Sequence, residues 1–179
     1  MSAAAAAIQR LVRDIPDFPE PGVVFKDITP LLADPRGFRT VVDALAQAGL
    51  GTGGEVGVDK VVGMEARGFI LGAPVALALG VGFVPVRKAG KLPGETHAVA
   101  YELEYGEAVL ELHHDALAPG DRVLIVDDVL ATGGTARATR ELVTQAGAAA
   151  VAMAALVELT FLPGWTAIDG LPFLSLAQV

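Results

Sequence analysis

The hydrophobic and polar positions of this chain alternate between two patterns. Short uninterrupted apolar runs predict buried strands, and longer segments with apolar residues at the helical period predict helices. The expected strands are 60–64, 81–86, 122–127, 149–157 and a short one near Phe173, and the expected helices are 2–13, 69–79 and 134–147. Strands that alternate with helices indicate an α/β fold with a central, mostly parallel sheet flanked by helices. We expect a single domain spanning residues 1–179.

The remaining segments carry turn and loop signals. A rigid Pro/Gly turn precedes an extended piece at 23–28, and Asp34 followed by Pro35 predicts the start of a further helix. Residues 88–100 are polar and contain Gly and Pro, so they predict a mobile loop. Two alternating segments within 101–112 predict a hairpin that follows this loop.

The most informative segment is the run from Val123 to Thr135. An apolar strand ends in Asp127 and Asp128, and a small-residue loop leads into the helix expected from Gly134. Loop N–H groups and a helix N-terminus can hold one phosphate, with threonine hydroxyls as further donors. Two carboxylates beside that phosphate suit the vicinal hydroxyls of a ribose. An ordinary strand-to-helix turn with an Asp cap would leave the paired acids unexplained, so we predict a phosphorylated-sugar site.

Cationic residues form two further candidate anion sites. Arg67 follows the strand at 60–64 and opens a helix, and Arg87, Lys88 and Lys91 share one Gly/Pro loop. A solvated surface charge is the ordinary role of such residues. In a chain of net charge −8, however, three cations within five positions need an anionic partner.

Bulk properties narrow the function classes. The chain has 179 residues, 53% of them hydrophobic and 19% charged, which argues against disorder. Its net charge of −8 argues against non-specific binding to nucleic acid or to an anionic membrane. It has no cysteine, so disulfides and thiolate metal sites are excluded and a cytoplasmic location is expected.

Two motifs carry little weight. Residues 49–54 match a GxGxxG pattern, but they follow a helix rather than a strand, which argues against a dinucleotide site. His113, His114 and Asp115 are neighbours in the sequence, and neighbouring strand residues face opposite ways, which argues against a metal site.

The run at 123–135 resembles the phosphoribosyl-pyrophosphate (PRPP) motif of the type I phosphoribosyltransferases. Other segments are similar to the adenine-specific branch of that family: 18–30, 65–69, 87–94, 101–106, 156–159 and 172–176. The departures are Glu65-Ala66 where Asp-Ser is common and Lys26 where Arg is common, and residues 161–171 match no pattern. The resemblance implies the type I fold, with an N-terminal helix and small base-binding hood segment (1–34) and a flexible catalytic loop and hairpin (87–112).

The resemblance also implies residue roles. It assigns catalysis to Glu104, Arg67 and Lys91. It assigns PRPP and AMP binding to Asp127, Asp128, Ala131, Thr132, Gly133, Gly134, Thr135, Arg67, Arg87, Lys88 and Lys91, and adenine binding to Val24, Phe25, Lys26 and Leu159. The Glu65–Ala66 bond is the candidate for a cis peptide. Related 6-oxo-purine enzymes carry an Asp where Ala131 stands, so Glu104 is expected to contact the purine N7 instead.

The implied activity is transfer of the phosphoribosyl group of PRPP to adenine, giving AMP and pyrophosphate. Mg²⁺ is the implied cofactor, bound mainly through PRPP and water with no direct protein ligand, and a homodimer is the implied assembly. Two alternatives stay open: a sibling enzyme acting on another base, and a non-catalytic PRPP-sensing module.

Overall fold

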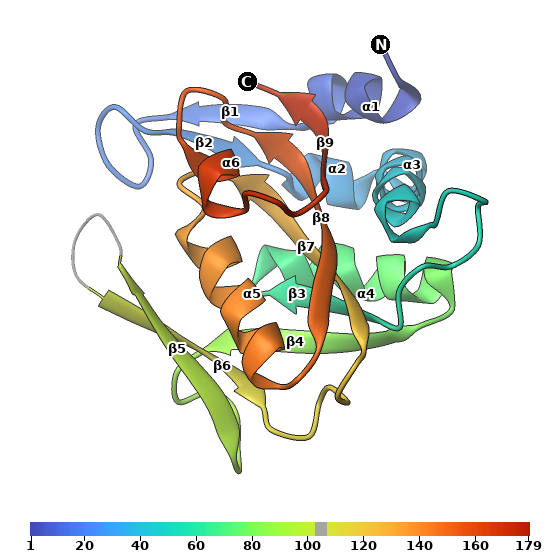
Figure 1. Cartoon of the computed structure of the whole chain (residues 1–179). Helices are drawn as coiled ribbons and strands as arrows, with labels where there is room; N and C mark the ends of the chain where they lie inside the picture. The colour runs from blue at the N-terminus through green and yellow to red at the C-terminus, as the bar shows by residue number, and fades with distance from the viewer. Residues whose placement is uncertain (103–106) are drawn as a thin grey trace.

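The computed structural model describes residues 1–102 and 107–179 (Figure 1). Its helices are α1 (Ala3–Leu11), α2 (Thr29–Ala33), α3 (Pro35–Ala46), α4 (Arg67–Leu79), α5 (Gly134–Gln145) and α6 (Gly164–Ala167), with a 3₁₀ turn at Gln47–Gly49. Its strands are β1 (Arg13–Pro16), β2 (Val24–Asp27), β3 (Lys60–Met64), β4 (Gly82–Lys88), β5 (Thr96–Glu102), β6 (Glu107–His113), β7 (Arg122–Leu130), β8 (Ala149–Glu158) and β9 (Phe173–Gln178).

A seven-stranded sheet forms the centre, in the order β5-β6-β4-β3-β7-β8-β9. The five strands from β4 to β9 in that order run parallel, and β5 and β6 form an antiparallel hairpin at one edge. This is the mostly parallel α/β sheet that the apolar runs predicted. Ligands of such sheets bind outside the carboxyl ends of the strands.

The two faces of β7 support two separate cores. Leu124 and Val126 pack with residues of α1, α3 and α4 on one face. Val123 and Ile125 pack with residues of α5 on the other face. Because successive strand residues point to opposite faces, a strand buried on both sides reads as one uninterrupted apolar run.

The predicted start of α3 is confirmed. The Asp34 carboxylate accepts a hydrogen bond from the Gly37 N–H at 2.6 Å, and Pro35 occupies the first helical turn. Val41 and Leu45 on its apolar face are buried.

Several boundaries differ from the sequence prediction. The predicted hairpin is present, but it begins earlier: residues 96–100, predicted as loop, belong to strand β5, which pairs with β6 from Thr96↔His113 to Glu102↔Glu107. The predicted helix 2–13 ends at Leu11, because Arg13–Pro16 instead pairs with Val24–Asp27 as a β-hairpin. Strand β7 continues past Asp127 to Leu130, since β8 pairs with it over that length. The short helices α2 and α6 had no sequence signal strong enough to predict.

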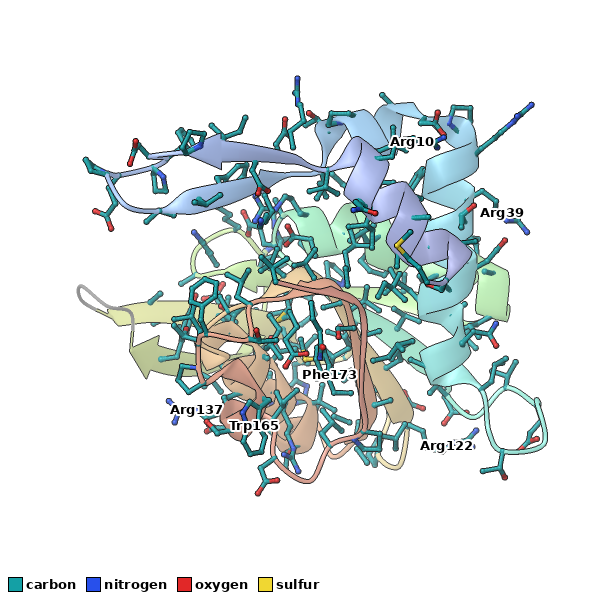
Figure 2. All side chains as sticks on the ribbon, turned by 90° about the horizontal axis from the view of Figure 1, so that it is seen from above. Arg10, Arg39, Arg122, Arg137, Trp165 and Phe173 are labelled. Carbon is teal, nitrogen blue, oxygen red and sulfur yellow. The ribbon has the colours of Figure 1, made fainter. Side chains whose placement is uncertain are left out.

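The β1–β2 hairpin and its connecting loop, residues 13–27, form the hood. In Figures 1 and 2 the hood and the β5–β6 hairpin extend toward the same side of the molecule, where β3 and β7 end. In the described part of the chain, no helix has the length and apolar character needed to cross a membrane.

Candidate active site

A cleft of about 480 Å³ lies at the carboxyl ends of the central strands. Its walls come from the hood, the β3–α4 connection, the ends of β4 and β7, and the residue after β8. The lining residues are Val23, Val24, Phe25, Lys26, Glu65, Ala66, Arg67, Lys88, Tyr101, Leu110, Asp127, Asp128, Val129, Ala131, Thr135 and Leu159.

A smaller hollow of about 80 Å³ adjoins this cleft, and the two share Asp127, Val129, Ala131 and Thr135. It is lined by the loop between β7 and α5, including Thr132, Gly133 and Gly134. Helix α5 begins at Gly134 with no side-chain cap on its first N–H groups. An uncapped helix N-terminus in a small-residue loop provides the donors that a phosphate group needs.

This phosphate loop packs directly on α6. Gly133 has a left-handed φ of +81°, and a Cβ atom there would lie 2.6 Å from the Gly164 carbonyl oxygen. A Cβ atom on Gly164 would lie 2.1 Å from the Ala131 carbonyl oxygen. Both glycines are therefore required for this close packing. Through Gly164, the segment 161–171, which matched no family pattern, packs against the phosphate loop.

The two acids at the end of β7 differ in environment. Asp128 is 3% exposed, and its N–H donates to the Asp127 carboxylate at 2.9 Å. Burial, with the adjacent Asp128 charge, raises the pKa of Asp127 well above its usual value. The two carboxyl groups form one wall of the cleft, and their oxygens suit hydroxyl or cationic partners.

Arg67 connects this wall to the hood. Its Nε lies 2.5 Å from the Asp128 Oδ2 atom, and its guanidinium carbon lies 4.8 Å from the centre of the Phe25 ring. A guanidinium over an aromatic face is a favourable cation–π contact. Phe18 packs edge-on against the same ring at 5.2 Å, so Phe25 is held at the mouth of the cleft.

Asp27 joins the two ends of the hood to each other and to the start of α2. Its carboxylate accepts hydrogen bonds from the Thr29 hydroxyl at 2.7 Å and the Thr29 N–H at 2.9 Å. Arg13 donates to it at 2.6 Å. These donors, with Thr29 contributing most, lower the pKa of Asp27 to about 2, so the anchor stays charged at neutral pH.

Glu65 contacts the cations that were predicted to share one loop; Arg87 and Lys88 instead end strand β4, and Lys91 lies in the loop that follows it. Its carboxylate contacts the Lys91 ammonium, lies 3.4 Å from the Arg87 Nε and accepts the Lys88 N–H at 3.0 Å. Burial alone would raise the pKa of Glu65, but the Lys91, Lys88 and Arg87 groups together hold it below its usual value. The Glu65–Ala66 peptide is cis, as predicted.

A family model for the phosphoribosyl transferase domain matches residues 31–160. The chain belongs to the phosphoribosyltransferase family.

Two similar relatives within that family are both adenine phosphoribosyltransferases. The adenine phosphoribosyltransferase of Nocardioides sp. is 66% identical over 169 residues, covering 94% of this chain and 91% of that protein. The adenine phosphoribosyltransferase of Thermobifida fusca is 58% identical and covers 96% of each chain.

Solved structures agree with this fold. The adenine phosphoribosyltransferase of Thermoanaerobacter pseudethanolicus has a TM-score of 0.92 and 49% identity, covering 98% of this chain and 99% of that one. The Saccharomyces cerevisiae enzyme, solved with an imino-altritol bisphosphate and adenine, has a TM-score of 0.93 and 41% identity, with the same coverage. The predicted type I fold and the predicted adenine-specific branch are confirmed.

The phosphoribosyltransferase site contains most of the predicted residues. The cleft and the adjoining hollow bring together Val24, Phe25, Lys26, Arg67, Lys88, Asp127, Asp128, Ala131, Thr132, Gly133, Gly134, Thr135 and Leu159. Arg87 and Lys91 are not among the lining residues and instead pair with Glu65. Glu104 lies outside the described residues, so its predicted role stays a prediction.

Sequence reasoning missed six residues that line the phosphoribosyltransferase cleft: Val23, Glu65, Ala66, Tyr101, Leu110 and Val129. Glu65 was noted as a departure from a more common Asp and as part of the candidate cis peptide, but no contact was predicted for its side chain. The sequence did hold one signal for Glu65: the cluster of cations at 87–91 required an anionic partner.

A complete protein-built metal site is not found in the part of the chain described. There, no three His, Cys, Asp or Glu side chains are grouped so as to hold a metal ion. Asp128 is paired with Arg67, and Asp127 accepts a hydrogen bond from its neighbour.

Proposed function

We propose that this protein is an adenine phosphoribosyltransferase, which transfers the 5-phosphoribosyl group of PRPP to adenine and releases AMP and pyrophosphate. One observation carries the proposal: a single cleft joins the acid pair, the phosphate loop, Arg67 and the hood aromatic Phe25. Purine salvage is the process that such a reaction serves.

The 5-phosphate of PRPP fits the loop between β7 and α5. Loop N–H groups, the start of α5 and the hydroxyls of Thr132 and Thr135 would donate to its oxygens. Asp127 and Asp128 would accept from the ribose hydroxyls, next to that phosphate. Because the two subsites share residues, one ribose 5-phosphate unit can span both.

Charge separation governs the chemical step. As the bond to pyrophosphate breaks, the ribosyl ring gains positive charge and the leaving group gains negative charge. The acid pair favours the cationic ring, while Arg67, Arg87, Lys88 and Lys91 provide fixed positive charge for the leaving group. The base nitrogen attacks from the opposite face of the anomeric carbon.

Adenine would bind between Phe25 and Leu159, which both line the cleft. Adenine presents an amino donor beside a ring acceptor, and the backbone at Val24 and Lys26 can answer with a C=O and an N–H. A 6-oxo purine would place acceptor against acceptor there, a mismatch that can discriminate by a factor of ~10⁴ or more. Ala131 offers no carboxylate for N7, so we assign that contact and proton transfer to Glu104.

We propose Mg²⁺ as the cofactor, bound mainly through PRPP oxygens and water. When bound, it supplies positive charge that helps the pyrophosphate leave. The acid pair would then contact it only indirectly, through ribose hydroxyls or water.

We also propose a homodimer in the cytoplasm. The dimer is proposed from the family resemblance, and light scattering coupled to gel filtration gives the molar mass that tests it. The location is proposed because the multiply charged PRPP does not cross a bilayer unaided, and cell fractionation tests it.

A base panel tests the function. The protein is incubated with PRPP, MgCl₂ and one nucleobase at a time, and the nucleotides are separated by chromatography. We expect AMP from adenine and little product from hypoxanthine, guanine, xanthine or orotate. Turnover only with another base would contradict the adenine assignment, and PRPP binding without any turnover would indicate a sensing module.

A further inference from the structure

Glu65 lies at the end of β3, on the wall of the cleft, with its side chain only 10% exposed. Its two oxygens face three donors of the segment 87–91, which comprises the end of β4 and the start of the loop that follows it. One oxygen contacts the Lys91 ammonium, and the other lies 3.0 Å from the Lys88 N and 3.4 Å from the Arg87 Nε. A nearly buried carboxylate with this many charged and polar donors is fully compensated.

The same segment has other contacts that do not involve its positive charges. The Gly90 N–H donates to the Glu111 carboxylate at 3.0 Å, and the Ala89 N–H donates to the Val109 carbonyl at 2.9 Å. These two bonds fix the backbone of the segment. Among the described residues, Glu65 is the acid that pairs with its Arg87 and Lys91 side chains.

The donors that meet Glu65 are those that the proposed reaction needs for pyrophosphate. A carboxylate and a phosphoryl group both present paired anionic oxygens to Arg, Lys and backbone N–H donors. Because the cations already have an anionic partner beside the cleft, they are held near the leaving-group position. The same partner must be displaced before they can contact a new anion.

We propose that Glu65 is a positioning residue that takes the place of pyrophosphate in the substrate-free protein. It holds Arg87 and Lys91 at the cleft wall and releases them when the pyrophosphate group of PRPP arrives. The inference rests on the proposed function, because that function assigns these cations to pyrophosphate. No covalent step is involved; one ion pair is exchanged for another.

The exchange makes Glu65 a competitor of pyrophosphate for the same cations. Removing the Glu65 charge should therefore strengthen pyrophosphate binding. Glu65→Gln keeps the shape and the acceptor for the Lys88 N–H but removes the charge. We expect the dissociation constant of inorganic pyrophosphate, measured by calorimetry at fixed MgCl₂, to fall about fivefold, as for loss of one partly exposed competing ion pair. Unchanged or weaker binding would overturn the proposal.

Two variants serve as controls. Glu111→Gln also removes one acidic charge that holds this segment, but Glu111 contacts the Gly90 N–H rather than the cations, so pyrophosphate affinity should stay at the wild-type value. Glu65→Asp keeps the charge and should return the affinity toward wild type. Equal tightening in Glu65→Gln and Glu111→Gln would mean a general charge effect and would reject the specific role of Glu65.

A second measurement needs no variant. In the wild-type protein without ligand, reductive methylation followed by mass spectrometry should modify Lys91 more slowly than Lys88, because the Lys91 ammonium is paired with Glu65. Equal rates would reject the pairing. The same preparation is assayed with PRPP and adenine: absence of AMP would remove the proposed function itself, whereas AMP formation with equal labelling would reject only the role of Glu65.

Discussion

At the scale of single residues, the site is a set of opposite charges that neutralise one another. Arg67 pairs with Asp128, and Glu65 pairs with Arg87 and Lys91. Asp127 is the exception, because burial and a neighbouring acid act on it together and its pKa rises. The protein itself disfavours the charged form of Asp127, and ionisable groups with shifted pKa values of this kind are common at functional sites.

Asp127→Asn should therefore make the free protein more stable while weakening PRPP binding. An acid whose native pKa exceeds its unfolded pKa lowers the free energy of unfolding as pH rises through that interval, so the gain appears at pH 7–8 and disappears near pH 4. A gain of about 1 kcal/mol corresponds to a rise of ~2–4 °C in Tm. Thermal unfolding followed by circular dichroism at several pH values measures it.

The matched control for this prediction is Asp59→Asn. Arg122 holds the pKa of Asp59 at about 2, so its charged form stabilises the fold and the variant should not gain stability. A lower Tm for Asp127→Asn at pH 8, or normal PRPP affinity, would contradict the proposed environment and role of Asp127.

Glu104→Ala should lower kcat by ~10²–10⁴ while leaving the dissociation constant of PRPP unchanged, because the proposed proton transfer involves the base and not the ribose. Steady-state kinetics with adenine and calorimetry with PRPP separate the two quantities. Glu95→Ala, which removes an exposed acid that the mechanism does not use, is the control. A normal turnover for Glu104→Ala would reject its role.

At the scale of elements, the phosphate loop depends on α6, a helix with no counterpart in the sequence motifs. Gly164→Ala would place a Cβ atom 2.1 Å from the Ala131 carbonyl oxygen, so the loop and α6 must separate. We expect a loss of ~1–3 kcal/mol in stability and a higher dissociation constant for AMP. Denaturant unfolding and AMP calorimetry measure the two effects.

Gly82→Ala is the control for that variant. Its new Cβ atom would meet only the flexible Lys60 side chain, at 3.1 Å or more, at the opposite end of the sheet. AMP affinity should be preserved there. If Gly164→Ala also preserved it, the packing of α6 would have no influence on the phosphate loop.

The sequence could predict those features whose residues all lie within one short continuous segment. The acid pair, the phosphate loop and Arg67 each belong to a continuous strand–loop–helix segment, so their chemistry and their placement could be predicted together. The cap of α3 by Asp34 is local in the same sense.

Features built by distant pairing could not be predicted. The contact of Glu65 with Lys91 joins residues 26 positions apart, and Arg13 reaches Asp27 across the hood. Residues 96–100 were predicted as loop, yet they belong to strand β5 because β6 pairs with them along their length. The pattern along the chain does not identify which distant residue will be the partner, since tertiary pairing overrides local preference.

At the scale of the whole molecule, the elements that line the cleft belong to both hydrophobic cores of the protein. The hood, α4 and the strand ends meet around it, so a nucleotide that contacts all of them is expected to stabilise the fold as a unit. AMP at about 100 times its dissociation constant adds ~2.7 kcal/mol. This should raise Tm by ~5–11 °C in a chain of this size.

Differential scanning calorimetry with AMP measures that shift, and IMP at the same concentration is the control. IMP carries the same ribose 5-phosphate with a 6-oxo purine, so a smaller shift isolates the contribution of the base. Equal shifts from the two nucleotides would show that the hood does not distinguish their bases.

The packing of α6 against the phosphate loop has an optical consequence. Trp165 is the sole tryptophan of the chain and lies on α6, directly after the glycine that contacts the loop (Figure 2). Its indole is 58% exposed, so its emission is sensitive to small changes in local polarity. Occupancy of the neighbouring anion pocket can therefore be followed by intrinsic fluorescence in the unlabelled wild-type protein, either in an equilibrium titration or by stopped-flow kinetics.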